Sequence, residues 1–266
     1  MEVIGIIFTF AVIFQIIDIL ILMKVRVFTA FSGYDSQCLA LDRLKEHFPN
    51  FDYELIGWSE IDKYAIQAHN ALFPQWSERN YGDISKIDWR AVPDFDLFTY
   101  SSPCQDFSNA GLQRGAEEGS GTRSSLLWEC RRAIVTKRPK YLLFENVAAL
   151  AGKKFIKLFN KWQSELTSYG YSNYASLLNS KDFGVPQNRN RLFLVSILGN
   201  EVFRFPEPFK LDIRLKDVLE ESVDDKYYLR DGYNMTSDGL SRCIKAQYYK
   251  NGRANFKESG VTEQQE

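Results

Sequence analysis

The chain has 266 residues and a formal net charge of −1. The length suits one large α/β domain, with or without a partial second one. The balanced charge argues against indiscriminate coating of nucleic acid, although a local basic cleft remains compatible with it. Four cysteines lie far apart without a CxxC pair, and neither of the two histidines adjoins a motif. This pattern argues against a metal site, a disulfide framework and a Cys–His dyad, and it fits a reducing cytoplasm.

Residues 1–22 form an apolar extension in which Gln15 and Asp18 are the polar breaks after Glu2. The length is enough for about one membrane span, but Asp18 facing lipid would cost roughly 2.5–3.5 kcal/mol. A signal peptide is disfavoured because a basic start and a small-residue cleavage site are missing. We favour an extension without function ahead of a natural start at Met23, and therefore expect a cytoplasmic protein. A membrane anchor and a buried helix stay open as alternatives.

From residue 24 onward, segments with strand and helix patterns alternate. Strands are expected over residues 24–31, 53–58, 95–100, 141–144, 171–178 and 192–198, and helices over 37–47, 62–72, 124–136 and 153–169. Such alternation predicts an α/β fold with a mostly parallel sheet and helices on both of its faces. Composition becomes more polar after Gly199, so we expect a main domain over 23–199 and a partial second region over 200–266.

In open parallel sheets, ligands bind outside the carboxyl ends of the strands. Four features fall there in this sequence: the loop that follows residue 30, Glu60, the pair Pro103-Cys104, and Glu145. Their shared location predicts that they form one site.

Cys104 is the candidate nucleophile. It follows Pro103 directly after the buried strand expected over 95–100, and the fixed φ of proline limits the loop and helps to aim the thiol. A cysteine reacts as its thiolate, which nearby positive charge or a helix N-terminus favours. The alternative is an inert cysteine in an ordinary strand-to-helix turn.

Glu145 and two arginines are candidate partners for this thiol. Glu145 ends an apolar run, where a partly desolvated carboxyl group could donate a proton near neutral pH. Arg189 and Arg191 alternate with Gln187 as in a strand, which would place both on one side to hold a pyrimidine carbonyl, a phosphate or Glu145. The alternatives are an acid that caps a turn and an edge strand with solvated basic residues.

Three further segments could hold a cofactor. The loop of Phe31, Ser32 and Gly33 could bring backbone close to a ligand, although it lacks the GxGxxG signature. Glu60 could accept hydrogen bonds from ribose hydroxyls, and Asp83 could contact an adenine amine. Each is a weak signal by itself.

Together these residues resemble the C5-cytosine DNA methyltransferase family. The motif order matches: Phe-x-Gly, an acid after the second strand, Gly-Asp-Ile, Pro-Cys-Gln-x-Phe-Ser, Glu-Asn-Val and Gln-x-Arg-x-Arg. The resemblance covers residues 24–199 and implies a Rossmann-like methyltransferase fold that uses S-adenosylmethionine. Residues 23–199 would then be the catalytic domain and 200–266 part of a target-recognition region.

The resemblance also implies a mechanism on double-stranded DNA, of restriction–modification or phage type. A flipped cytosine is attacked at C6 by Cys104, while Glu145 binds N3 and C5 takes the methyl group. Arg189 and Arg191 would position the base, with Arg191 nearer the pyrimidine oxygen. The cofactor would be held by Phe31, Ser32, Gly33, Glu60, Asp83 and Pro103.

Two departures from the family pattern qualify this expectation. Asp35 stands where the first loop usually has a second glycine, which a small polar loop should tolerate. The family's last segments are not found, so the chain resembles a fragment, a split enzyme that needs a complementing C-terminal chain, or an inactive remnant. An RNA cytosine methyltransferase is the alternative activity. Basic and aromatic residues over 240–257 could contact DNA.

Overall fold

The computed structural model describes residues 24–103, 126–218 and 239–242. The apolar extension 1–22, Cys104 and most of the basic stretch 240–257 lie outside these ranges. No helix within them has the length and apolar composition of a membrane span.

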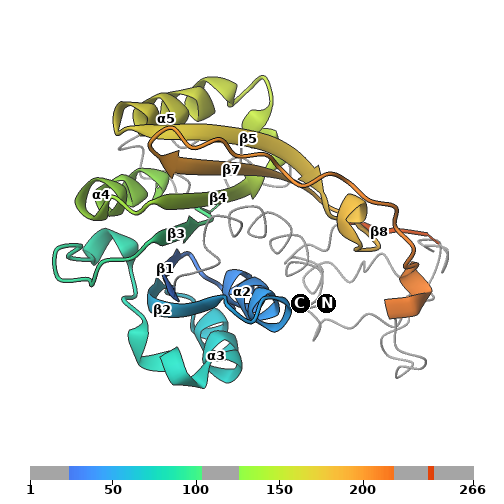
Figure 1. The fold of residues 1–266 in the computed structure, drawn as a ribbon, viewed down its shortest axis with the longest axis horizontal. Coiled ribbons are helices and arrows are strands. Elements are labelled where there is room, and N and C mark those ends of the chain that lie inside the picture. The colour runs from blue at the N-terminus through green and yellow to red at the C-terminus, as the bar shows by residue number, and fades with distance from the viewer. Residues whose placement is uncertain (1–23, 104–125, 219–238, 243–266) are drawn as a thin grey trace.

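A mixed sheet of six strands forms the centre of the fold, in the order β2-β1-β3-β4-β7-β5 (Figure 1). The strands are β1 Lys24–Ala30, β2 Asp52–Ser59, β3 Leu97–Tyr100, β4 Tyr141–Val147, β5 Tyr171–Asn179 and β7 Asn190–Leu198. β1 pairs in parallel with β2 and β3, and β3 pairs in parallel with β4. β7 runs antiparallel to both of its neighbours, β4 and β5. The prediction of a mostly parallel sheet is confirmed.

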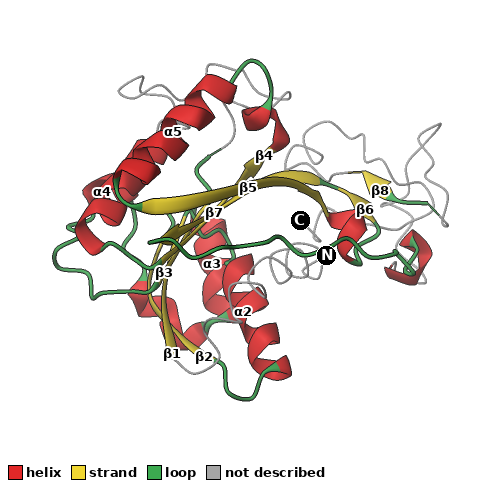
Figure 2. Ribbon diagram, turned by 45° about the horizontal axis from the view of Figure 1, so that its top comes forward, coloured by secondary structure: helices red, strands yellow, loops and turns green. Residues whose placement is uncertain are grey.

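Helices cover both faces of the sheet, as the sequence predicts (Figure 2). They are α2 Ser36–His47, α3 Lys63–Leu72, α4 Leu127–Lys137 and α5 Ile156–Ser168. Side chains of a strand alternate between its two faces, so Val27 joins the apolar cluster with Leu41 of α2. Phe28 joins the opposite cluster with Ile134 of α4 and Trp162 of α5. β1 is therefore buried on both sides, as expected of a central parallel strand.

Short elements complete the described fold. They are the 3-10 turns Pro74–Arg79, Ile84–Lys86, Ala148–Ala151, Ser180–Phe183 and Leu215–Val218, and the strands β6 Gln187–Asn188 and β8 Ser241–Arg242. β6 and β8 pair in parallel as a second, two-stranded sheet. In chain order, β7 is the last strand of the six-stranded sheet, and it ends at Leu198. The domain boundary expected near residue 199 stays a prediction.

One predicted element is wrong. A single strand was expected to run from Gln187 into residues 192–198, but the backbone breaks at Arg189 between two strands of different sheets. The Arg189 N–H donates to the side chain of Asn179 at 3.0 Å, and its carbonyl accepts from the Ser180 N–H at 3.1 Å. These bonds take the place of strand pairing at Arg189. The alternation of side chains along a strand therefore does not place Arg189 and Arg191 on the same side.

Candidate active site

Four strand ends meet along one edge of the sheet, where the parallel strands β2, β1, β3 and β4 all finish (Figure 1). Backbone hydrogen bonds continue past the strands: Ser32 N–H donates to the Ser59 carbonyl at 3.2 Å, and Ser101 N–H to the Ala30 carbonyl at 3.5 Å. The predicted shared location therefore holds for the described members of the site.

Glu145 and Arg191 form an ion pair at this edge. Arg191 lies at the start of β7, opposite Val147 in the register with β4, and its Nε is 2.8 Å from Glu145 Oε1. The Glu145 side chain is 27% exposed and that of Arg191 16%. Ser101 Oγ donates to the other Glu145 oxygen at 3.3 Å. The carboxylate is thus fixed by two groups yet keeps a face open toward a ligand.

Arg189 lies near this pair in the chain but is held differently. Its side chain is half-buried, and its backbone is fixed by Asn179 and Ser180. Its predicted contact with the base stays a prediction, whereas the predicted pairing of an arginine with Glu145 falls to Arg191.

Asn146 is a site residue that the sequence interpretation did not single out. Its side chain is buried, and its amide donates to the Ser102 carbonyl at 3.0 Å. Its own oxygen accepts from the Val147 N–H at 2.9 Å. Asn146 therefore ties the end of β4 to the residue that precedes Pro103-Cys104. Its position directly after Glu145 was the available signal, but the role depends on Ser102, which lies just past the end of β3.

The two described cysteines are unsuited to nucleophilic attack. Cys38 and Cys130 have no exposed surface. Burial raises the pKa of the Cys38 thiol well above its ordinary value, and Asp35 adds to the effect. Burial likewise raises the pKa of Cys130, with a smaller contribution from Glu129. Both stay as inert thiols. Cys104 itself lies outside the described residues, one position after the half-buried Pro103.

The loop after β1 contains a left-handed turn. Phe31 and Gly33 have φ angles of 56° and 59°. A side chain at Gly33 would meet no atom within 4 Å, so the space beside this residue is open. Ser32 instead is buried and bonds Thr29 at 2.9 Å. A left-handed turn with open space above it fits close approach of a ligand to backbone.

Glu60 fixes this loop from the end of β2. One carboxylate oxygen accepts from the Gly33 N–H at 2.9 Å, and the other from the N–H groups of Ile61 and Asp62 at 2.8 and 2.9 Å. The Asn80 side chain bonds both the N–H and the carbonyl of Glu60. A carboxylate has about four lone-pair sites, so Glu60 keeps acceptor capacity for ribose hydroxyls.

Asp83 belongs to the same end of β2. Ser59 Oγ donates to the Gly82 carbonyl at 2.6 Å, which draws the segment before Asp83 to the strand end. Asp83 caps the turn Ile84–Lys86. The Ser85 hydroxyl and N–H both donate to its carboxylate and hold the pKa of Asp83 below its usual value. The contact with an adenine amine stays a prediction.

Asp35 does not point toward the open side of the loop. It has no exposed surface, adopts a left-handed φ of 66° and caps helix α2 by accepting from the Cys38 N–H at 3.2 Å. The left-handed backbone explains why a glycine suits this position. The substitution is accommodated because the side chain turns into the protein.

Basic residues over 126–140 lie away from this edge. Lys137 and Lys140 flank the turn into β4, at the amino ends of the parallel strands. They pair with Asp94 and Glu201 at 3.1 and 2.9 Å, and Arg131 pairs with Glu165 at 3.2 Å. Acidic side chains therefore pair with three of the basic residues in this stretch.

Comparison with known proteins defines the class. The family model described as C-5 cytosine-specific DNA methylase matches residues 25–257, and the chain belongs to that family. A type II methyltransferase of Lactococcus lactis subsp. cremoris, M2.ScrFI, is 39% identical over 85% of this chain and 76% of its own length. The orphan methyltransferase M.SPRI of Bacillus phage SPR is 36% identical over 78% of this chain, which spans 53% of that relative.

Solved structures show the same fold. S. pombe Dnmt2 methyltransferase superposes with a TM-score of 0.65 at 21% identity, covering 85% of this chain and 73% of that chain. Entamoeba histolytica EhMeth gives 0.66 at 19% identity, covering 86% and 73%. The Rossmann-like methyltransferase fold and the use of S-adenosylmethionine that characterise this family agree with the open turn at Gly33 and the acceptor at Glu60.

Proposed function

We propose that the chain acts as a DNA (cytosine-5-)-methyltransferase of restriction–modification or phage type, methylating a cytosine flipped out of double-stranded DNA. The observation that carries the proposal is the Arg191–Glu145 pair beside the Ser102–Asn146 anchor. It supports the proposal because Glu145 contacts Ser101 and Asn146 contacts Ser102, the two residues that precede Pro103-Cys104 in the chain. We place the protein in the cytoplasm, with no membrane partner.

S-adenosylmethionine, when bound, supplies an electrophilic methyl group. The chain holds it through the backbone of Phe31, Ser32 and Gly33, through the carboxylates of Glu60 and Asp83, and through Pro103. Glu60 accepts from the ribose hydroxyls while it keeps its bond to Gly33. These are the residues expected from the family pattern, and their common edge of the sheet supports the assignment.

The Cys104 thiolate forms a bond to C6 of the flipped cytosine. The C5–C6 double bond opens, and Glu145 stabilises the charge that develops through N3. C5 becomes nucleophilic and forms its bond to the methyl carbon, while the bond from that carbon to the sulfonium sulfur breaks and the sulfur leaves as a neutral thioether. A base then removes the C5 proton, the double bond returns and the bond between C6 and the Cys104 sulfur breaks. Arg191 holds Glu145 and reaches the pyrimidine oxygen, and Arg189 supports the catalytic loop.

Transfer of a labelled methyl group to DNA or to transfer RNA tests the substrate class. The full chain is incubated with labelled S-adenosylmethionine and each acceptor in turn. We expect label in C5 of cytosine in duplex DNA and none in RNA. Label in RNA alone would show an RNA methyltransferase, and cofactor binding without transfer to either acceptor would show an inactive remnant. A complementing C-terminal chain, which the comparisons do not support, stays a prediction.

A further inference from the structure

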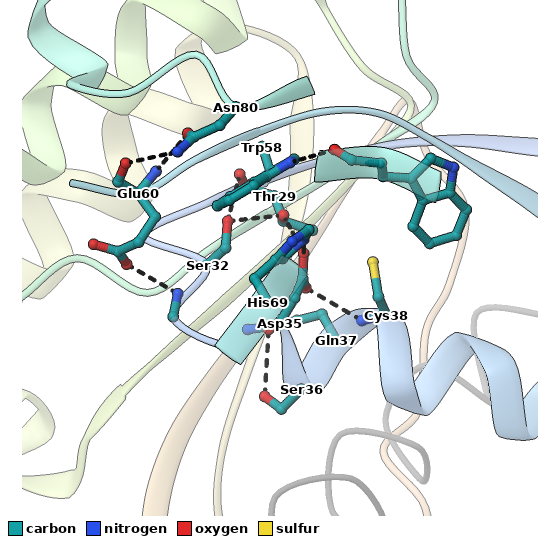
Figure 3. A network of polar contacts seen from close by, with 12 residues as sticks. Thr29, Ser32, Asp35, Ser36, Gln37, Cys38, Trp58, Glu60, His69 and Asn80 are labelled. Carbon is teal, nitrogen blue, oxygen red and sulfur yellow. Dashed lines mark hydrogen bonds and ion pairs between the residues drawn. The ribbon is translucent and has the colours of Figure 1, made fainter. Parts of the chain in front are cut away.

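A buried carboxylate and a buried imidazole lie close together beneath the loop of residues 31–35, the loop proposed to hold the cofactor. Asp35 and His69 have no exposed surface, and His69 Nε2 lies 3.6 Å from Asp35 Oδ2 (Figure 3). Asp35 ends the loop of residues 31–35 and caps α2, whereas His69 comes from the second half of α3. The pair therefore connects the loop to a helix on the same face of the sheet.

The Asp35 carboxylate is the centre of this network. Thr29 Oγ1 donates to Oδ2 at 2.7 Å and the Cys38 N–H to Oδ1 at 3.2 Å. Thr29 also bonds the Ser32 hydroxyl at 2.9 Å. A buried carboxylate is costly unless donors surround it. His69 Nε2 is a third polar atom near the carboxylate, at 3.6 Å from Oδ2, which is longer than a hydrogen bond.

Aromatic stacking holds the imidazole in place. The His69 ring lies flat on the indole of Trp58, with ring centroids 3.6 Å apart and planes 16° from parallel. Phe73 packs against it at 5.3 Å. Neither ring nitrogen of His69 has a hydrogen-bond partner among the described residues. The charged neighbour of the ring among them is the Asp35 carboxylate, 3.6 Å from Nε2.

The segment that leads into α3 holds the outer side of the loop. α3 begins just after Glu60, whose carboxylate binds the Gly33 N–H and the N–H of Asp62, the residue that caps α3. The loop is therefore fixed at Gly33 by the residue that precedes α3 and at Asp35 by a residue within α3. A shift of the helix would move both contacts together.

We propose that His69 is a positioning residue for cofactor binding, which acts through Asp35 to keep the loop of Phe31, Ser32 and Gly33 in its ligand-ready turn. The inference rests on the proposed function, because it assigns the loop to S-adenosylmethionine. His69 does not touch the cofactor. It fixes the carboxylate that sets the left-handed end of the loop and the bonds of Thr29 and Ser32.

Paired substitutions separate positioning from packing. His69→Phe keeps a ring to stack on Trp58 and loses the nitrogen toward Asp35, whereas His69→Gln restores a donor at a similar reach. We expect His69→Phe to raise the Kd for S-adenosylmethionine about tenfold, the lower end of what loss of a supporting partner costs at metal sites, with kcat at saturating cofactor unchanged. His69→Gln should recover part of the affinity. His47→Phe, the same change at the exposed second histidine, should leave the Kd unchanged.

A measurement on the unsubstituted chain does not depend on whether the His69 variants fold. The chain contains two histidines, so two sets of ring signals appear after isotopic labelling of histidine, and His47→Phe assigns them. On titration with S-adenosylmethionine, the His69 ring signals should shift and the His47 signals should stay. Static His69 signals during saturable cofactor binding would overturn the inference.

The outcomes separate the two levels of the proposal. A wild-type chain that does not bind S-adenosylmethionine in calorimetry refutes the proposed function and this inference with it. A wild-type chain that binds, together with a folded His69→Phe variant of lower melting temperature and unchanged Kd, refutes the positioning role alone. A higher Kd with unchanged kcat supports it.

Discussion

Arg191 and Glu145 meet across two strands that run in opposite directions, with Nε 2.8 Å from Oε1. β7 is the antiparallel strand between β4 and β5, so its first residues lie beside the last residues of β4. This reversal brings an arginine from late in the chain to the carboxyl edge, where the other site residues lie. The direction of β7 is therefore part of the construction of the site.

Loss of Arg191 should affect turnover more than folding. Arg191→Ala removes the fixed partner of Glu145, and we expect kcat to fall by about 10²-fold, the size seen when a fixed electrostatic contact is lost. The kcat of Arg191→Lys should lie between those of wild type and Arg191→Ala, because a lysine keeps the charge but not the planar donor set. Methyl transfer under saturating DNA and cofactor measures the effect.

The exposed Arg90, in a turn ahead of β3 and outside the site, provides the matched control. Arg90→Ala should leave kcat unchanged. Full turnover by a folded Arg191→Ala variant would show that the pair has no part in the reaction.

Asn146 should matter for activity because it holds the loop that leads to Cys104. Asn146→Asp is nearly isosteric but replaces the donor to the Ser102 carbonyl with an acceptor. A buried polar group without its partner costs about 1–3 kcal/mol, and a displaced nucleophile should lower kcat by about 10–100-fold. Asn160→Asp, on the exposed face of α5, is the control. Equal kcat for Asn146→Asp and wild type would contradict the anchor role.

Asp96 should give the fold a defined pH dependence. Its carboxylate accepts from the Arg26 backbone at 2.9 Å and from the guanidinium at 3.1 and 2.8 Å, which joins β1 to the residue before β3. Burial alone would raise the pKa of Asp96, but the bonds from Arg26 outweigh burial and lower it. A carboxylate whose pKa is lowered in the folded state contributes stability at pH values above its unfolded-state pKa. That contribution is lost as the pH falls through the folded-state pKa.

Asp96→Asn should therefore reduce the free energy of unfolding by about 1 kcal/mol at neutral pH, a figure discounted for the partial exposure of the pair. The difference from wild type should shrink as pH drops below about 4. Urea unfolding at pH 7 and at pH 3.5 measures the gap at each pH, that is, the difference in free energy of unfolding between variant and wild type. Asp212→Asn, at an 81% exposed side chain, should show no gap. A gap for Asp96→Asn that is the same at both pH values would exclude the ionised pair as its cause.

Local pattern predicted much of this fold. The alternation of strands and helices and the motifs at the strand ends depend on neighbours in sequence. The start of α3 is equally local, because Asp62 accepts from the N–H groups of Tyr64 and Ala65. The break at Arg189 could not be predicted in this way, because it depends on the Asn179 side chain and on pairing with β8.

Three other roles were not predicted from the sequence, because each depends on side-chain partners that are far apart in the chain or on burial. Asn146 belongs to a recognised motif, but its function becomes visible only with Ser102 in place. His69 adjoins no motif in the sequence, and only the fold places it beneath Asp35. Asp35 itself was predicted to be tolerated, but its burial and its role as a helix cap depend on Thr29 and Cys38.

The central claim is that Cys104 attacks C6 of the target cytosine, and duplex DNA with 5-fluorocytosine at the target tests it most directly. Fluorine at C5 prevents loss of the C5 substituent, so the bond between enzyme and base persists. With S-adenosylmethionine present, we predict a denaturant-resistant complex for the wild-type chain and for Cys38→Ala, in which a buried thiol is lost, and none for Cys104→Ser. Persistent trapping by Cys104→Ser would contradict the account.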